Sequence, residues 1–323
     1  MSKRKTLLSW LQSFAPGFLA ALFYGLVSGS MSFLNKVVLT TFKFHYPDIV
    51  MLAQVVLTSI VVELCRVTKM CDIPQWTWQR GKEFLIPSLC FALHTTLALA
   101  ALAELSIPIY NVLRRMLPLA SLLMARYVLK KTLSRKTYVA IAFTVVGTLM
   151  AGFGDLQFKL YGYVDAILSV MAQSFYLTYV QKTGIEKGAS ALSVLHLNSI
   201  NCILPLMMYT LWNGSLLQAA RFEGFKDSSF NMSFMINVSM GCVLNYSLFL
   251  CATMNSALTT SVVGVVKGVI TSIIGFFTFG GVPPSALTLG GVSMNALGGA
   301  LYTFAKYREK QILLQKAKTE LPL

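Results

Sequence analysis

The sequence predicts an all-α polytopic membrane protein in which ten transmembrane helices form two inverted five-helix repeats. Of the 323 residues, 55% are hydrophobic and only 12% are charged, with a mean hydropathy of +0.65. This composition leaves too few charged residues to cover a water-soluble domain. Apolar runs long enough to cross a bilayer recur from end to end, and basic residues gather in alternate connections between them.

The first half, residues 1–155, is expected to form a repeat of five spans. Its N-terminal apolar run follows Lys3, Arg4 and Lys5 and lacks a clear small-residue cleavage site, so we expect a retained span and not a signal peptide. The third and fourth spans are divided only by "ELS" and Pro108, so nine spans in total is an alternative. Taking runs of roughly 17 to 25 apolar residues, the expected ranges are 17–40, 47–66, 84–103, 107–129 and 137–153.

The second half, residues 156–305, is expected to form the second repeat, and residues 306–323 a basic cytoplasmic tail. The halves meet near "GFGDLQFKLYGY" (152–163). The tail begins "KYREKQILLQKAKTE" and could dock partners, with a solvated or lipid-facing stretch as the alternative. The same length criterion gives the ranges 160–181, 191–212, 230–253, 257–279 and 285–305.

The basic residues set the expected orientation. With a cytoplasmic N-terminus, eighteen of the 27 basic residues fall in cytoplasmic segments, and only Lys43, Lys159, Arg221 and Lys226 fall on the opposite side. Because Lys and Arg accumulate in cytoplasmic loops, both termini are expected in the cytoplasm. Five spans per half then make the second half enter with opposite orientation, the inverted repeat of many transporters. The net charge of +15 thus reflects a basic membrane protein, and not binding to nucleic acid.

Five basic residues lie inside expected spans: Lys36, Arg114, Arg115, Arg126 and Lys267. A cation in the bilayer interior costs about 2.5–3.5 kcal/mol. Arg126 lies near a cytoplasmic end, where its side chain can reach the interface, and Lys36 lies near the opposite face. Arg114 and Arg115 lie on the order of 11 Å into the fourth span, and Lys267 about 15 Å into the ninth. These three are too deep to reach water easily.

Carboxylates do not neutralise the deep cations. Only Glu63 and Asp165 fall clearly inside spans, both near ends, and Asp165 is a candidate partner for Lys36. A bound anion is therefore the natural partner, and two guanidinium groups with one ammonium suit a diphosphate better than a single carboxylate. The alternative is a structural role, in which arginine side chains bond helix carbonyls. Adjacent side chains point about 100° apart, so the sequence leaves open which arginine faces the cavity.

Polar and aromatic residues in the spans could line a site for a base and a sugar, although each could instead form a helix–helix hydrogen bond or an interfacial contact. Gly264 and Gly268 bracket Lys267 with GxxxG spacing and would leave room for a ligand there. The candidate substrate-binding residues are Lys267, Arg114, Arg115, Gly264, Tyr110, Asn111, Asn198, Asn245, Tyr246, Thr260, Lys36 and Asn35.

The sequence carries no signature of an enzyme. It has no GxGxxG, P-loop, HExxH or GxSxG motif, and its three histidines are scattered. The six cysteines lack CxxC or framework spacing, which indicates small buried side chains. We expect no catalytic residue, metal or cofactor.

Several segments resemble nucleotide-sugar transporters of the drug/metabolite transporter superfamily, closest to solute carrier family 35, subgroup D. The resemblance covers nearly the whole chain. It is carried by "LNKVVLTTFKFHYP" (34–47), "IPIYNVLRRMLP" (107–118), "GDLQFKLYGY" (154–163), "FEGFKD" (222–227) and "NSALTTSVVGVVKG" (255–268).

This resemblance implies a ten-helix antiporter of the Golgi or endoplasmic reticulum membrane, which brings a cytosolic nucleotide sugar into the lumen and returns the nucleoside monophosphate. Lys267 and Gly264 match the family's ninth-helix Gly/Lys motif, and Asn198 matches an asparagine of the aromatic-Asn-Asn motif of GDP-mannose carriers. Here the Gly/Lys run is one residue shorter than in those carriers, and "LHLNSIN" (195–201) lacks the aromatic-Asn-Asn. Both departures favour UDP-sugar and UMP as substrates.

Two other functions stay open. The chain could carry another phosphorylated metabolite, such as GDP-mannose or a sugar phosphate, because an anion clamp does not select a base. It could also be a trafficking or adaptor protein that has kept the fold and lost transport. A homodimer is one option for the oligomeric state.

Overall fold

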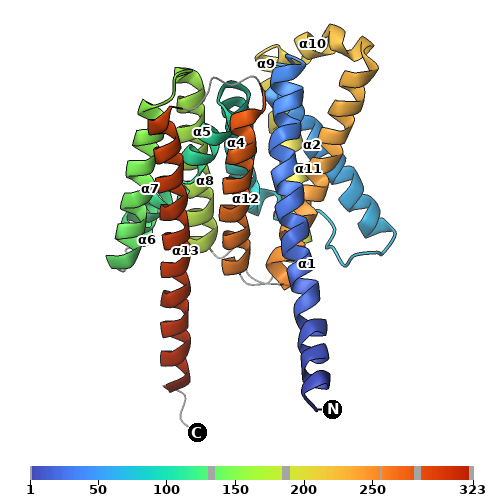
Figure 1. Ribbon diagram of the computed structural model, residues 1–323. Coiled ribbons are helices and arrows are strands. Elements are labelled where there is room, and N and C mark those ends of the chain that lie inside the picture. The colour runs from blue at the N-terminus through green and yellow to red at the C-terminus, as the bar shows by residue number, and fades with distance from the viewer. Residues whose placement is uncertain (1, 130–134, 184–189, 255–256, 280–284, 320–323) are drawn as a thin grey trace.

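The computed structural model describes residues 2–129, 135–183, 190–254, 257–279 and 285–319. Within these ranges the regular secondary structure is helical, with no strand. The long helices run alongside one another between two ends that carry the connections, and α1 begins at the end of the bundle where α13 finishes (Figure 1). The predicted all-α class is confirmed.

The helices of the first half follow the order expected from the apolar runs. They are α1 (Ser2–Lys36), continued by the π-helix η1 (Val37–Thr41), α2 (Pro47–Val67), the short α3 (Trp78–Glu83), α4 (Leu85–Glu104), α5 (Ile107–Arg114), α6 (Leu117–Leu129) and α7 (Arg135–Phe153).

The second half adds two short elements between its longer helices. Its elements are α8 (Leu160–Thr183), α9 (Ala191–Trp212), α10 (Ser215–Ala220), the 3-10 helix η2 (Glu223–Lys226), α11 (Ser228–Met254), α12 (Ala257–Phe277) and α13 (Ala286–Thr319). Each expected range is occupied by helix, but two helices are longer than expected. α1 already begins at Ser2, and α13 continues through the expected tail to Thr319, because Lys, Glu, Gln, Leu and Ala are strong helix formers.

The fourth expected span is interrupted, with α5 ending at Arg114 and α6 beginning at Leu117. Pro118 explains the break, since it has no N–H to donate to the carbonyl of Arg114 one turn earlier. Arg115 caps the C-terminus of α5 with φ −73° and ψ −3°. Discontinuous helices of this kind form substrate sites in many transporters, and here the break falls at the paired arginines.

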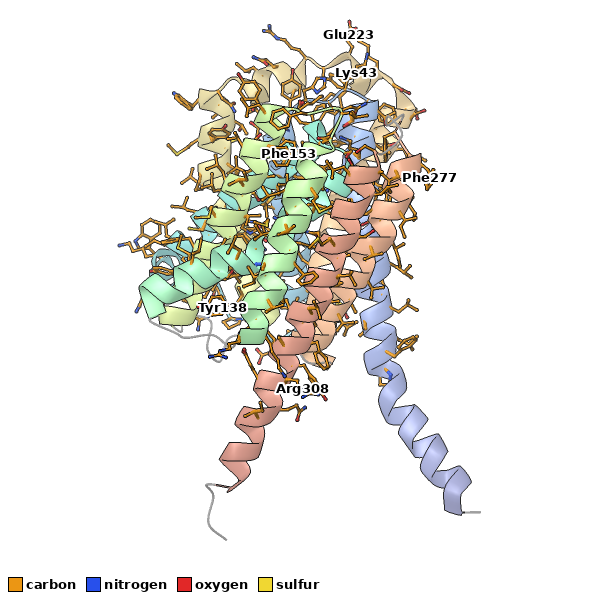
Figure 2. The ribbon with its side chains drawn as sticks, turned by 60° about the vertical axis from the view of Figure 1, so that its left-hand side comes forward. Lys43, Tyr138, Phe153, Glu223, Phe277 and Arg308 are labelled. Carbon is orange, nitrogen blue, oxygen red and sulfur yellow. The ribbon has the colours of Figure 1, made fainter. Side chains whose placement is uncertain are left out.

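The outer surface of the bundle is apolar. Five stretches among the described helices are long and apolar enough to cross a membrane: Pro16–Thr41, Pro47–Val67, Leu85–Glu104, Arg135–Phe153 and Leu192–Trp212. Phe153 and Phe277 point outward and are 83% and 86% exposed, whereas Lys43 and Glu223 lie at one end and Arg308 toward the other (Figure 2). Exposed apolar side chains on this scale belong in contact with lipid.

Helices of the two halves pack against each other throughout. α7 packs along α13, α2 on α9, and α5 on α12. In addition α4 packs along α8, and α11 along α1. The core is therefore shared between the halves, and neither half buries its apolar faces alone.

Glycines let α7 and α13 approach each other closely. A Cβ atom on Gly147 would lie 2.3 Å from the backbone nitrogen of Asn295, and one on Gly291 would lie 2.3 Å from that of Ala151. Neither contact can be relieved by moving a side chain, because both opposing atoms are backbone. Small residues at such interfaces are what allow membrane helices to pack at short distance.

We expect the Gly147→Val variant to lose at least about 1–3 kcal/mol of stability, because the added side chain must separate the two helices. Gly290→Val is the matched control, since the Cβ atom at this position would meet only the flexible Met150 Cε atom at 3.6 Å. Thermal unfolding in detergent measures both. Equal unfolding temperatures for the two variants would contradict this packing.

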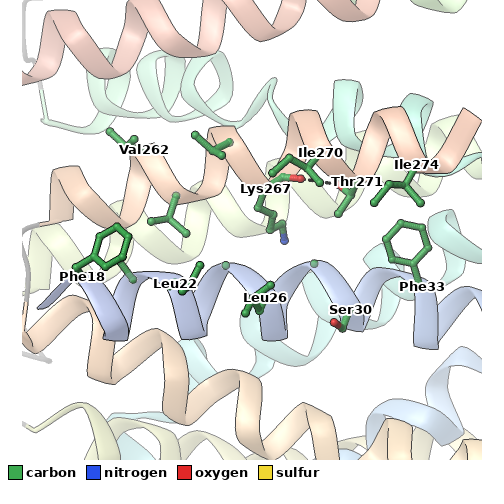
Figure 3. A pocket seen from close by; sticks show the side chains of 15 residues that line it. Phe18, Leu22, Leu26, Ser30, Phe33, Val262, Lys267, Ile270, Thr271 and Ile274 are labelled. Atoms are coloured by element: carbon green, nitrogen blue, oxygen red, sulfur yellow. Dashed lines mark hydrogen bonds between the residues drawn. The ribbon is translucent and has the colours of Figure 1, made fainter. Parts of the chain in front are cut away.

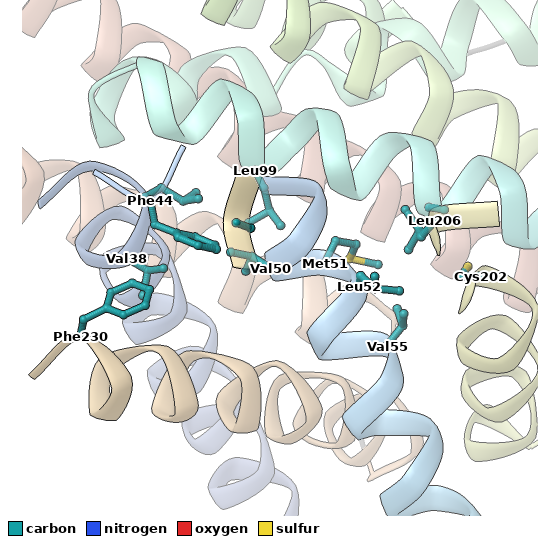
Figure 4. Close-up of a cluster of buried hydrophobic side chains, with 13 residues drawn as sticks. Val38, Phe44, Val50, Met51, Leu52, Val55, Leu99, Cys202, Leu206 and Phe230 are labelled. Carbon is teal, nitrogen blue, oxygen red and sulfur yellow. The ribbon is translucent and has the colours of Figure 1, made fainter. Parts of the chain in front are cut away.

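An aromatic cluster closes the end of the bundle opposite the chain termini. Fully buried Phe44 lies at its centre, with the ring centroids of Tyr46 and Phe222 both 5.2 Å away and that of Phe230 5.4 Å away. From Phe44 and Phe230 the apolar core continues inward along α2, through Val50, Met51, Leu52 and Val55 (Figure 4). This cluster fixes the connection after α1 to α2 and α11.

Candidate functional site

A cavity of about 320 Å³ lies inside the bundle, between helices of both halves. Its walls come from α1, α4, α5, α11 and α12. The lining residues are Ser28, Met31, Ser32, Asn35, Leu102, Tyr110, Asn111, Arg114, Arg115, Leu244, Gly264, Lys267 and Gly268. The break after α5 brings both arginines to this cavity, and α12 brings Lys267.

Lys267 is held by α1. Its Nζ donates to Ser28 Oγ at 2.6 Å, and Ser28 O lies 3.4 Å away. This bond orients the ammonium group without neutralising it, because a serine hydroxyl carries no charge. The Lys267 charge therefore remains available to an anion.

The two arginines are held differently. Arg114 donates from Nη1 to Ser169 Oγ of α8 at 3.3 Å, and its guanidinium lies 6.0 Å from the ring centroid of Tyr110. Arg115 donates from Nη1 to Asn295 Oδ1 of α13 at 3.1 Å, while its buried Nη2 has no hydrogen-bond partner among the described residues. The sequence left open which of the two arginines faces the cavity. In the structure both line it. Arg115 in addition braces α13.

Gly268 makes room for Arg115. A Cβ atom at this position would lie 2.7 Å from Arg115 Nη2. By contrast, nothing lies within 4 Å of a Cβ placed on Gly264, one turn away. Gly264 therefore leaves free space in the cavity, whereas Gly268 accommodates the guanidinium.

The cavity is strongly electropositive. Three basic side chains line it, and no carboxylate does. The ion pairs found in the part of the chain that the structure describes lie elsewhere: Glu63 with Arg66 and His196, Glu104 with Lys159, and Glu309 with Lys306. A ligand with two or more negative charges would meet complementary groups here at once.

Two buried amides tie the broken helix to the second half. Asn111 Nδ2 donates to Thr271 Oγ1 at 2.9 Å and to Ser272 Oγ at 3.1 Å, both on α12. Asn295 Nδ2 donates to Thr148 Oγ1 at 3.0 Å while its Oδ1 accepts from Arg115. These bonds fix the positions of the arginines relative to Lys267.

Seven of the twelve residues predicted from the sequence line this cavity: Asn35, Tyr110, Asn111, Arg114, Arg115, Gly264 and Lys267. Three others lie elsewhere. Asn198 is buried on α9 and accepts from Ser88 Oγ at 2.8 Å, Asn245 donates to Gly241 O of its own helix at 3.0 Å, and Tyr246 is 49% exposed. The side chain of Thr260 lies outside the described residues.

The twelfth residue, Lys36, lies outside the cavity lining. It is 5% exposed, and its Nζ donates to Leu102 O, Ala103 O and Leu105 O at 2.9, 3.0 and 2.7 Å. These carbonyls belong to the C-terminal end of α4, where a cation is favourable. Lys36 thus bonds carbonyl oxygens, and not the Asp165 carboxylate considered from the sequence.

Sequence reasoning missed four polar residues around the site. Ser28 and Ser32 line the cavity, and Ser169 and Asn295 hold the arginines. The spacing of Ser28, Ser32 and Asn35 puts them on one helix face, so a polar stripe on an apolar helix was the available signal. Asn295 gave a weaker signal, as a lone amide in an apolar helix.

Comparison with known proteins places the chain in a family. A family model described as the Triose-phosphate Transporter family matches residues 16–303. The chain belongs to this family. It is therefore a membrane transporter and not an enzyme, and the resemblance found in the sequence is confirmed.

Curated relatives share most of the chain's length. It is 33% identical over 304 residues to UDP-galactose/UDP-glucose transporter 7 of Arabidopsis thaliana, covering 94% of each chain. It is 31% identical to UDP-sugar transporter UST74c of Drosophila melanogaster, covering 90% of this chain and 78% of the relative. It is 30% identical to the human nucleotide sugar transporter SLC35D2, covering 88% of this chain and 85% of the relative.

A solved crystal structure shares the fold. It superposes with a TM-score of 0.52 at 13% sequence identity, covering 91% of this chain and 98% of that chain. This likeness concerns the fold alone.

Proposed function

We propose that this transporter carries a nucleotide sugar, moving a cytosolic UDP-sugar into the lumen of the Golgi or endoplasmic reticulum in exchange for UMP. The observation that carries the proposal is the cavity in which Arg114, Arg115 and Lys267 come together without a carboxylate. The relatives named above are transporters of UDP-sugars or nucleotide sugars, which supports the substrate class.

In this proposal the cations hold the phosphates, which are common to the UDP-sugar and to UMP. Lys267 and the free Nη2 of Arg115 would each contact a phosphate oxygen, and Arg114 would complete the site. Tyr110 and Asn35 offer a ring and an amide to the base or the sugar. A shared phosphate site explains exchange, because one ligand must leave before the other can bind.

The helix packing supports an inverted repeat with ten spans. In such a repeat α1 corresponds to α8, and α4 corresponds to α11. The contact between α4 and α8 should then have a counterpart between α11 and α1, and both contacts are present. The same correspondence maps the pairs α7 with α13, α2 with α9, and α5 with α12 onto themselves. Two such halves, residues 1–155 and 156–305, can rock about the central cavity to expose it alternately to each side. The start of α1 and the end of α13 lie at the same end of the bundle, as an even number of spans requires. We place this end, with both termini, in the cytoplasm.

A nucleotide panel tests the substrate class. We expect UMP and UDP-sugars to raise the thermal unfolding temperature of the purified protein more than GMP, GDP-mannose or inorganic phosphate does, because ligands that bind only the folded state stabilise it. A larger shift with guanine nucleotides would instead favour the GDP-mannose alternative. A larger shift with sugar phosphates would favour a sugar-phosphate transporter. No shift of the unfolding temperature with any anion would contradict a transport site in this cavity.

Lys36 provides a matched comparison with Lys267, because both are lysines within the bundle but only Lys267 lines the cavity. We expect Lys36→Met to lower stability by at least about 2 kcal/mol, since the buried carbonyls of Leu102 and Leu105 lose this donor, whereas Ala103 O keeps its hydrogen bond from Thr40 Oγ1. The stabilisation by UMP should remain. If instead stability is unchanged and the UMP effect disappears, Lys36 belongs to the substrate site.

A further inference from the structure

An apolar groove follows the seam between α1 and α12, behind Lys267 (Figure 3). Its volume is about 580 Å³. The walls are mostly aliphatic, with Leu22 and Leu26 on α1 and Val262, Val266, Ile270 and Ile274 on α12. No charged group other than Lys267 lines it.

The groove is open to the outside of the bundle. Leu26 is 62% exposed, Val266 52% and Ile270 51%, although all three lie well inside their helices. In a membrane protein this face meets the hydrocarbon chains of lipids, and not water. The groove therefore needs an apolar occupant.

The groove is long, and one of its ends is closed. Gly25 and Gly29 form part of its floor, where a Cβ atom on Gly25 would already lie 3.2 Å from Val263 Cγ1. From Phe18 to Phe33 it extends for about 22 Å along α1. Phe33 stacks on Phe279 with ring centroids 6.3 Å apart and nearly parallel planes, beyond which no lining residue of α1 lies. An occupant that lies along the groove therefore extends toward the Phe18 end, the end that carries the chain termini.

Lys267 separates the groove from the polar cavity. The same side chain lines both, and its ammonium group points from α12 toward α1 (Figure 3). On this side Lys267 therefore lies between the polar cavity and the groove that faces the lipid. Whatever fills the groove therefore lies against the Lys267 side chain from the lipid side.

We propose that the α1–α12 groove is a binding site for one acyl chain of a membrane phospholipid, which seals the back of the Lys267 site. The length of the groove matches a chain that enters from one leaflet, whose hydrocarbon layer is about 15 Å thick, and that reaches past the midplane. The bound chain covers the aliphatic stem of Lys267 and excludes water behind its ammonium group. In a site without water the charge of Lys267 interacts more strongly with a phosphate.

The shape and chemistry favour a lipid chain over other occupants. A polar ligand would lose most of its hydrogen bonds with water, because beside Lys267 the lining offers only the hydroxyls of Ser30 and Thr271, and that of Thr271 already donates to Lys267 O at 2.9 Å. A helix of a second protein copy is about 10 Å across, whereas a volume of about 580 Å³ spread over about 22 Å of length is too slender to hold one. An unbranched hydrocarbon chain fits both constraints.

Photo-crosslinking in liposomes tests the proposal. The full-length protein is reconstituted with a phospholipid that carries a diazirine near the end of one acyl chain, and the adducts are mapped by mass spectrometry. We expect adducts at Leu22, Val266 and Ile270 to exceed, several-fold, those at Leu297 and Phe304 of α13. These two residues are 60% and 54% exposed but line no part of the groove. Equal labelling at both sets would mean only ordinary surrounding lipid and would overturn the proposal.

Filling the groove provides the second arm. Leu26→Trp and Val266→Trp add bulk where the side chains are already exposed, so we expect both to abolish the excess labelling at Leu22 and Ile270. Leu297→Trp is the control and should leave the excess unchanged. If the groove variants instead convert a dimer into a monomer in detergent, the groove is a protein interface and the proposal is wrong. The wild-type labelling ratio decides the matter even if neither groove variant folds.

Discussion

Replacing Lys267 with alanine is expected to reduce UDP-sugar uptake by on the order of a hundredfold or more, while the protein stays folded. Removing one member of a buried charge pair costs about 2–5 kcal/mol, and Lys267 supplies a deep cation to a cavity without a carboxylate. The substitution leaves no charge unpaired, because among the described residues Lys267 bonds only the Ser28 hydroxyl and carbonyl oxygen. The fold should therefore tolerate it.

Two measurements make this result decisive. Thermal unfolding without nucleotide checks the fold, and the UMP-induced rise in unfolding temperature checks the site. In Lys267→Ala the unfolding temperature without nucleotide should stay close to that of the wild type, and the rise induced by UMP should disappear. Wild-type uptake by this variant would exclude Lys267 from substrate binding.

The second large effect concerns Arg115, whose two terminal nitrogens serve different purposes. Nη1 donates to Asn295 Oδ1, and Nη2 is buried without a partner among the described residues. Lysine cannot do both, because its ammonium is a single point charge and not a planar fork. We expect Arg115→Lys to weaken UMP binding by about 10- to 100-fold, the loss of one hydrogen bond to a charged group.

Arg114→Lys is the matched control, since it changes the same chemistry one residue away. Among the described residues, Arg114 donates one hydrogen bond, to Ser169 Oγ, which a lysine can replace. We therefore expect a smaller loss of UMP affinity than in Arg115→Lys, measured by calorimetric titration. The reverse order of the two effects would mean that Arg115 serves only to brace α13.

The positions of the helices were largely predictable from the sequence. Long apolar runs interrupted by charged connections mark helices that have to satisfy their backbone hydrogen bonds internally. The extensions of α1 and α13 were not predicted, because the search criterion was apolarity and the added residues are polar helix formers. The interruption after Arg114 was not predicted either, although Pro118 provided the signal.

The candidate site was predicted in part. Arg114, Arg115 and Lys267 were singled out because buried cations without carboxylates are costly, and the structure brings them to one cavity. Lys36 fitted the same argument but bonds three carbonyls, a tertiary contact that has no signature in the sequence. Tyr246 was predicted to line the site but is 49% exposed, because a tyrosine in an apolar helix can face lipid as well as a cavity.

The supporting residues depended on tertiary structure. Asn295 holds Arg115 from a helix 180 residues further along the chain, and Ser169 holds Arg114 from α8. Residue spacing within one helix does not predict which residue of another helix will contact an arginine. Only the stripe of Ser28, Ser32 and Asn35 was open to periodicity arguments.

Exchange in proteoliposomes shows directly whether the cavity at Lys267 binds UDP-sugar and UMP in turn. Liposomes holding the purified protein are preloaded with UMP, with GMP or with buffer, and the uptake of labelled UDP-sugars is followed for wild type and Lys267→Ala. We predict rapid uptake only for the wild type and only with UMP inside, because one phosphate site serves both ligands. Uptake that is equally fast from buffer-loaded liposomes, or no UDP-sugar uptake across the panel, would contradict the account.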